Sequence, residues 1–107
     1  MSAAGFLVMR RDGVLWGVAN AAVGALTRHL GGGFRIAVGT AELAVDEIVG
    51  VVPELAVKPL APVVRRFWPE AAGGLAIHAG GPLVVVDPRR PPRALSARPI
   101  QEQEGDE

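Results

Sequence analysis

The side chains of this chain that could do acid–base or metal chemistry are few and scattered. The histidines are His29 and His78, and the chain contains no cysteine. His78 falls on the side of an alternating apolar segment that should face solvent. His29 ends a segment with helical spacing, where an imidazole offsets the helix dipole. Two histidines without a supporting cluster make a weak zinc site, so we expect no metal and no cofactor.

Other patterns with catalytic potential are equally weak. Asp46 and Glu47 are adjacent, so their carboxyl groups point to different sides, whereas a general acid–base dyad needs two carboxyl groups that face each other. The three glycines at 31–33 are not followed by the Lys-Ser or Lys-Thr of a phosphate-binding loop. No serine stands in a Gly-x-Ser-x-Gly elbow. The sequence therefore predicts a protein that is not an enzyme.

Length, charge and composition narrow the class of protein. The 107 residues fit one domain. Eleven basic and eleven acidic residues give a formal charge of zero, which argues against a general nucleic-acid binder because such proteins need a basic surface. The uncharged run 13–27 is shorter than the roughly 20 residues that span a bilayer. We expect a cytoplasmic globular domain without membrane insertion.

Short apolar segments separated by glycine, proline and aspartate predict a mainly β fold. Asp12-Gly13 lies between the apolar segments 6–10 and 14–18, and Asp-Gly in this position favours a hairpin because both turn residues tolerate a positive φ. Two more hairpins are predicted from alternation and turn residues, joining 34–38 to 42–45 and, through Gly80-Gly81, 75–79 to 82–87.

The connecting segments are harder to assign. Val23, Leu26 and Leu30 follow a helical spacing, so a short helix is predicted for 19–30. An irregular turn is predicted for 46–50, and three prolines between 53 and 62 exclude a long central strand there.

One segment mixes basic and aromatic residues. Arg65-Arg66-Phe67-Trp68 could stack on nucleic acid. The neutral overall charge favours a different interpretation, in which an arginine pair lies beside a core or interface tryptophan. The chain ends in a stretch that is rich in arginine and proline, followed by acidic residues, and a solvated, disordered tail is predicted for 96–107.

Three segments together carry a resemblance to a known family. The first is the opening strand pair with Asp12-Gly13. The second is Leu-Ala-Val-Asp-Glu-Ile-Val-Gly-Val at 43–51, and the third is the closing hairpin at 74–87, which ends in Val85-Val86-Asp87. This order resembles the CheW-like domain, the chemotaxis coupling domain that joins chemoreceptor tips to a histidine kinase. Val-Gly-Ala-Leu at 23–26 occupies the place of the family's Val-x-Glu-Val motif, without its acidic residue.

The resemblance also shows what this chain lacks. The family normally has two further strands, with an arginine-containing motif, between the early helix and the strand before Val-Asp-Glu-Val. Here the chain runs from Leu30 through three glycines directly to Phe34. A complete member resembles two small SH3-like β-barrels side by side. The implied fold is a truncated CheW-like domain over residues 1–95 that is mainly β, with one or two short helices and one barrel reduced by loss of strands.

Function and partners follow from the resemblance. In the family, the receptor tip docks in the groove between the barrels, and the kinase's regulatory domain docks edge to edge through one barrel. The resemblance implies a non-catalytic adaptor in a bacterial chemosensory pathway that binds the signalling domain of a methyl-accepting chemoreceptor, with histidine-kinase binding lost or weakened. The FrzB-type accessory adaptors of the frizzy-aggregation (Frz) pathway are similarly short. The residues expected to contact the receptor are Val23, Leu26, Val45, Asp46, Ile48 and Val49.

Alternatives remain open at the level of the sequence. Each aliphatic residue of the expected receptor site could instead belong to the core, and Asp46 could cap a turn. A second interpretation of the whole chain is a small β-barrel scaffold that self-associates through an unpaired strand edge and binds no receptor. A third is a nucleic-acid module of the oligonucleotide-binding-barrel type, although no direct nucleic-acid contact is expected.

Overall fold

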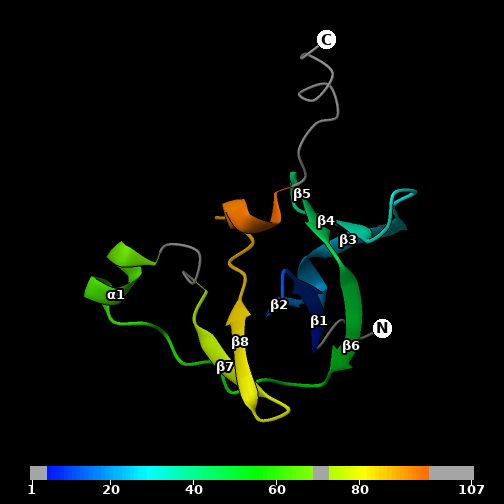
Figure 1. Cartoon of the computed structure of the whole chain (residues 1–107). Helices are drawn as coiled ribbons and strands as arrows, with labels where there is room; N and C mark the ends of the chain where they lie inside the picture. The colour runs from blue at the N-terminus through cyan, green and yellow to red at the C-terminus, as the bar shows by residue number, and fades with distance from the viewer. Residues whose placement is uncertain (1–4, 69–72, 97–107) are drawn as a thin grey trace.

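The structure is a computed structural model that describes residues 5–68 and 73–96, and it is mainly β with two sheets (Figure 1). The strands are β1 (Phe6–Arg11), β2 (Val14–Ala19), β3 (Val23–Arg28), β4 (Phe34–Val38), β5 (Ala41–Val45), β6 (Glu47–Val52), β7 (Leu75–His78) and β8 (Gly81–Val85). The helical elements are the short 3-10 turns η1 (Asn20–Ala22) and η3 (Arg93–Leu95) and the helix α1 (Pro62–Phe67). Apart from Ser96, the predicted tail lies outside the described residues.

The larger sheet has five strands in the order β6-β1-β2-β8-β7. Its first hairpin, β1–β2, confirms the Asp-Gly prediction: Asp12 and Gly13 both have positive φ, of 54° and 80°, as a tight hairpin turn with two central residues requires. The closing hairpin, β7–β8, is also confirmed. It joins the first hairpin through a parallel pairing of β2 with β8, in which Trp16 lies opposite Val84.

The smaller sheet has the order β3-β4-β5, and its first strand replaces the helix predicted for 19–30. Only residues 20–22 are helical, and the chain is extended afterwards. The predicted apolar stripe does not form, because Leu26 and Leu30 are exposed. Gly24 disfavours a helix by about 1 kcal/mol relative to alanine. Pairing with β4 along the whole of β3 satisfies the backbone, whereas a helix of this length has little stability of its own.

Residues 46–50 also differ from the prediction, because they are not an irregular turn. Asp46 alone makes the bend, and β6 begins at Glu47 and pairs antiparallel with β1. The β-branched residues of β6 favour a strand, and β1 offers it a free edge. A register shift between Val8 and Met9 absorbs the extra residue of β6.

The larger sheet is buried on both faces and therefore belongs to two cores. Along β1, Leu7 and Met9 point into a main core that the smaller sheet covers, while Val8 points into a second core on the opposite face. The main core contains eleven buried residues: Leu7, Met9, Trp16, Val18, Ile36, Val38, Leu43, Val45, Val84, Val86 and Leu95. The second core is smaller and contains Val8, Ala76, Leu83 and Val85.

No strand covers the second core from outside in the part of the chain that the structure describes. The chain after β6 covers it instead, with Leu55 and Val57 packed against the buried residues. This segment then rounds the edge of β7, where Lys58 and Leu75 exchange backbone hydrogen bonds of 2.7 and 2.9 Å. Leu60 packs against the main core on the other side. The prolines of this segment exclude a long strand, as predicted.

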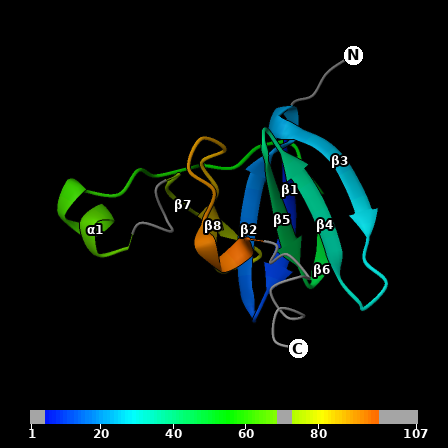
Figure 2. The ribbon, with the colours of Figure 1, turned by 90° about the horizontal axis from the view of Figure 1, so that it is seen from above.

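The helix α1 follows this segment and stands apart from both sheets, beyond β7, in both views (Figure 1, Figure 2). Its sequence could not be assigned to a helix or a strand from residue types alone. Pro62 occupies the first turn of the helix, where proline is well tolerated.

The connection between β3 and β4 provides a test of local geometry. Gly32 and Gly33 both have positive φ, of 106° and 82°, but only Gly33 is sterically closed: a Cβ there would lie 2.5 Å from the Val45 carbonyl oxygen. We expect Gly32→Ala to lower the free energy of unfolding by about 1–2 kcal/mol, from the backbone conformation alone, and Gly33→Ala by about 2–4 kcal/mol. Urea unfolding of the two variants measures the difference, and equal losses would contradict the close approach.

Candidate docking surface

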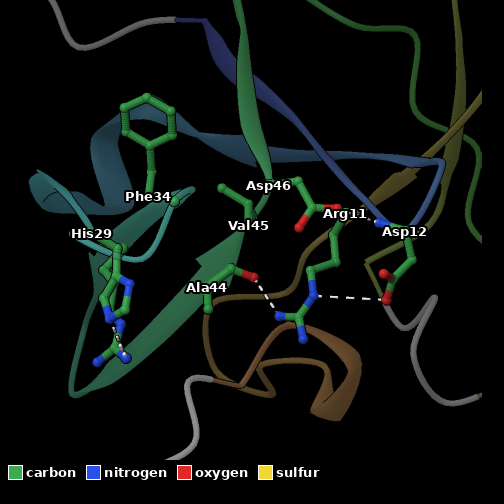
Figure 3. Close-up of a pocket in the computed structure, with 9 residues that line it drawn as sticks. Arg11, Asp12, His29, Phe34, Ala44, Val45 and Asp46 are labelled. Carbon is green, nitrogen blue, oxygen red and sulfur yellow. Dashed lines mark hydrogen bonds and ion pairs between the residues drawn. The ribbon is translucent and has the colours of Figure 1, made fainter.

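The end of the β1–β2 hairpin lies against the β3–β4 connection and the end of β5, and a pocket of about 280 Å³ opens between them (Figure 3). Two residues of the predicted receptor site, Val45 and Asp46, are among the nine that line it. The nine are Arg11, Asp12, His29, Gly32, Phe34, Arg35, Ala44, Val45 and Asp46. Because ionisable side chains line it, this pocket is a candidate for a binding or catalytic site.

Arg11 and Asp46 are both held by the backbone of neighbouring turns. Oδ2 of Asp46 accepts a hydrogen bond of 2.8 Å from the backbone N–H of Asp12, and the backbone N–H of Asp46 donates to the carbonyl of Arg10. Arg11 Nη1 donates to the Ala44 carbonyl at 2.6 Å (Figure 3). These bonds tie the β1–β2 turn to the β5–β6 junction. Asp46 therefore anchors a turn in this structure.

His29 is likewise engaged with its surroundings. Gly31 N–H lies 3.2 Å from its Nδ1, and Arg35 Nη2 lies 3.2 Å from its Nε2. A neutral imidazole has only one acceptor nitrogen, so only one of these contacts can be a full hydrogen bond at a time. Arg35 also pairs with Glu42 at 3.5 Å. The polar groups of the pocket thus hold one another and the adjoining turns in place.

The residues predicted to contact a receptor are not all at the surface. Val45 is only 3% exposed and is part of the main core. Val23 and Ile48 are half-buried and pack against the same core. In this conformation the side chain of Val45 offers no surface to a partner, and those of Val23 and Ile48 offer a part.

The other two aliphatic residues of the predicted set are exposed on edge strands. Leu26 lies on β3 and is 47% exposed, and Val49 lies on β6 and is 40% exposed. Among the described residues, β3 pairs only with β4 and β6 only with β1, so the outer side of each strand is unpaired. Both views place β3 and β6 on the side of the molecule away from α1 (Figure 1, Figure 2). We call the exposed side chains Leu26, Val49 and Val51 the edge surface.

Sequence reasoning did not identify every exposed apolar group. Val51 is one of them, and it continues the alternation of β6. The helix α1 and the residue after it expose four large side chains, which recur at i and i+4, a spacing that could have revealed one helical face. They are Val63, Val64, Phe67 and Trp68.

Some further observations concern metals, membranes and known proteins. Within residues 5–68 and 73–96, no three His, Asp or Glu side chains gather closely enough to hold a metal ion. None of the helices described there has the length and apolar character needed to cross a bilayer. Comparison of the chain with protein-family models, curated proteins and solved structures found no match.

Proposed function

We propose that the chain is a non-catalytic adaptor of the CheW-like type, which binds the helical signalling tip of a methyl-accepting chemoreceptor. The observation that carries the proposal is the two-sided larger sheet, with a main core under a second sheet and a small core covered by an extended segment. Such an arrangement is compatible with a small barrel-like fold in which one barrel is reduced. The proposal rests on this arrangement together with the resemblance carried by the opening hairpin, the Val-Asp-Glu-Ile segment and the closing hairpin.

The edge surface combines the two exposed aliphatic residues of the predicted receptor site, Leu26 and Val49, with Val51, which the prediction did not include. It presents Leu26, Val49 and Val51 from two strands that have no outer neighbour among the described residues. A helical hairpin with an apolar ridge is the kind of partner that packs against exposed aliphatic side chains of this sort.

The same reduction of the second barrel weakens kinase binding at the β7 edge, the edge of the larger sheet that lies outside the edge surface. In the family, the regulatory domain of the kinase pairs edge to edge with one barrel, so it needs a regular strand edge. On the reduced side of this protein, β7 forms the edge of the larger sheet, and the backbone of Lys58 already occupies part of it. An incoming strand would have to displace that pairing.

A titration of the purified chain with a soluble chemoreceptor signalling fragment tests the proposal. We expect saturable binding with a dissociation constant of about 1–100 μM, because a few exposed aliphatic anchors give modest affinity. A helical hairpin of equal length with polar residues in place of the apolar ridge is the matched control partner and should not bind. Equal binding to both hairpins, or no heat change with either, would contradict the proposal.

A further inference from the structure

The apolar face of α1 is the largest exposed apolar feature of the described chain that the proposed function does not use. Phe67 is 82% exposed, and its neighbours on the helix are exposed with it. Successive helical residues turn by about 100°, so Val63, Val64 and Phe67 fall within one arc of the helix, and Trp68 follows directly at its C-terminal end. We call these four side chains the arm.

A second apolar surface lies on the larger sheet, beyond the area that the smaller sheet covers. Val14 stands two residues before the buried Trp16, Pro82 two before the buried Val84, and all four therefore face the main-core side of the sheet. Ile77 lies opposite Pro82 on β7 and is 69% exposed. Val14, Pro82 and Ile77 form a line across three neighbouring strands, which we call the row.

The arm does not cover the row of its own chain, since both surfaces remain exposed. Figures 1 and 2 show α1 beyond β7, held away from the strands by the extended segment that precedes it. Prolines at 53, 59 and 62 restrict the freedom of that segment. The chain therefore carries two exposed apolar surfaces that do not pack against each other within one copy.

We propose that two copies of the chain associate reciprocally, with the arm of each seated on the row of the other. Complete burial of the exposed surface of the four arm and three row side chains would remove at most roughly 650 Å² per copy, and at most roughly 1,300 Å² in the two copies together, with areas of about 150–250 Å² taken for large residues. This upper bound lies at the lower end of the range for specific protein interfaces, about 1,200–2,000 Å². A reciprocal contact closes after two copies, so it gives a dimer and not a filament.

Charge favours the same pairing. Arg66 lies between the residues of the arm, and it is exposed. Beside the row, the carboxylate of Asp12 is 83% exposed and has only a long 3.7 Å pairing with Arg11. The exposed side chain of Arg66, next to the arm of one copy, can thus approach Asp12 of the other copy. The formal charge of zero leaves no net repulsion between two copies.

Sedimentation of the full chain over a concentration series from about 1 μM to about 1 mM tests the proposal, since interfaces of this size dissociate within or below that range. We expect a concentration-dependent dimer. Phe67→Asp in the arm and Ile77→Asp in the row should each weaken dimerisation at least about tenfold, while Thr40→Asp, in the exposed β4–β5 turn, should leave it unchanged. All three positions are exposed, so circular dichroism should show the same fold in each variant.

Mixing the two weakened variants separates the proposed contact from an arm-to-arm dimer. If the arm of one copy binds the row of the other, a mixture of the two variants retains one intact contact, between the arm of Ile77→Asp and the row of Phe67→Asp. The mixture should then associate more strongly than either variant alone. If Ile77→Asp alone still forms the full dimer, or if the unmodified chain is monomeric at about 1 mM, the proposal is wrong. Receptor binding should be unaffected by Phe67→Asp. Loss of receptor binding in a monomeric chain would instead assign the arm to the receptor.

Discussion

Replacing Leu83 with alanine is expected to lower the free energy of unfolding by about 2–5 kcal/mol, the cost of removing a fully buried leucine side chain. Leu83 has no exposed surface and is the largest buried side chain of the second core. It packs directly over Gly17, where an added Cβ would approach its Cδ2 to 2.8 Å. Thermal unfolding should move down by roughly 10 °C or more, because each kcal/mol shifts the midpoint by about 4–8 °C in a domain of this size.

Val51→Ala is the matched control for this variant. It also removes methyl groups from a strand of the larger sheet, but Val51 is largely exposed, so we expect a loss below about 0.5 kcal/mol. Leu83→Ala would contradict the two-core fold if it cost no more than Val51→Ala, because the second face of the sheet would then be solvated.

The double variant Leu26→Glu, Val49→Glu is expected to reduce binding of the receptor fragment by at least about 100-fold, since each apolar anchor contributes about 1–3 kcal/mol and a carboxylate cannot pack against an apolar ridge. Both side chains are exposed, so the variant should unfold cooperatively near the temperature of the unmodified chain. Calorimetric titration and thermal unfolding of the same sample measure both quantities.

Two controls make this result interpretable. Thr40→Glu adds the same charge at an exposed turn outside the edge surface and should bind the receptor normally. Val45→Glu places a carboxylate in the main core and should destabilise the fold itself, which separates core residues from contact residues within the predicted site. Normal binding by the double variant would show that the receptor does not use the edge surface.

Local signals in the sequence predicted most of the strands. Asp12-Gly13 determines a hairpin because its two residues accept the required φ values. Alternation in 34–38 and 42–45 predicted the β4–β5 hairpin, which the structure confirms. These features depend on neighbours in the chain, so a single sequence contains the necessary information.

The two wrong predictions of secondary structure concern segments whose conformation depends on pairing with a distant strand. The spacing of Val23, Leu26 and Leu30 is compatible with a helix, but pairing with β4 overrides that local preference. Asp46-Glu47 suggests a turn, yet only Asp46 bends the chain, because β1 has a free edge for Glu47 and the residues after it. Neither partner strand is visible from the local pattern.

The predicted site shows the same limit. Residue type identified aliphatic side chains near the Val-Asp-Glu-Ile segment, but it could not distinguish the buried Val45 from the exposed Val49. Once β5 and β6 are known to be separate strands, the alternation of each assigns these two side chains to opposite environments. The exposed face of α1 became visible only when the segment was known to be helical and to stand apart from the sheets.

The proposed function requires that the chain binds the receptor and has a much lower affinity for the kinase. Parallel titrations of one preparation, with the receptor signalling fragment and with the kinase's regulatory domain, test it most directly. The account predicts that the receptor fragment binds at least about 100-fold more tightly, a difference of about 2.7 kcal/mol. Binding of the regulatory domain with equal or higher affinity would contradict it.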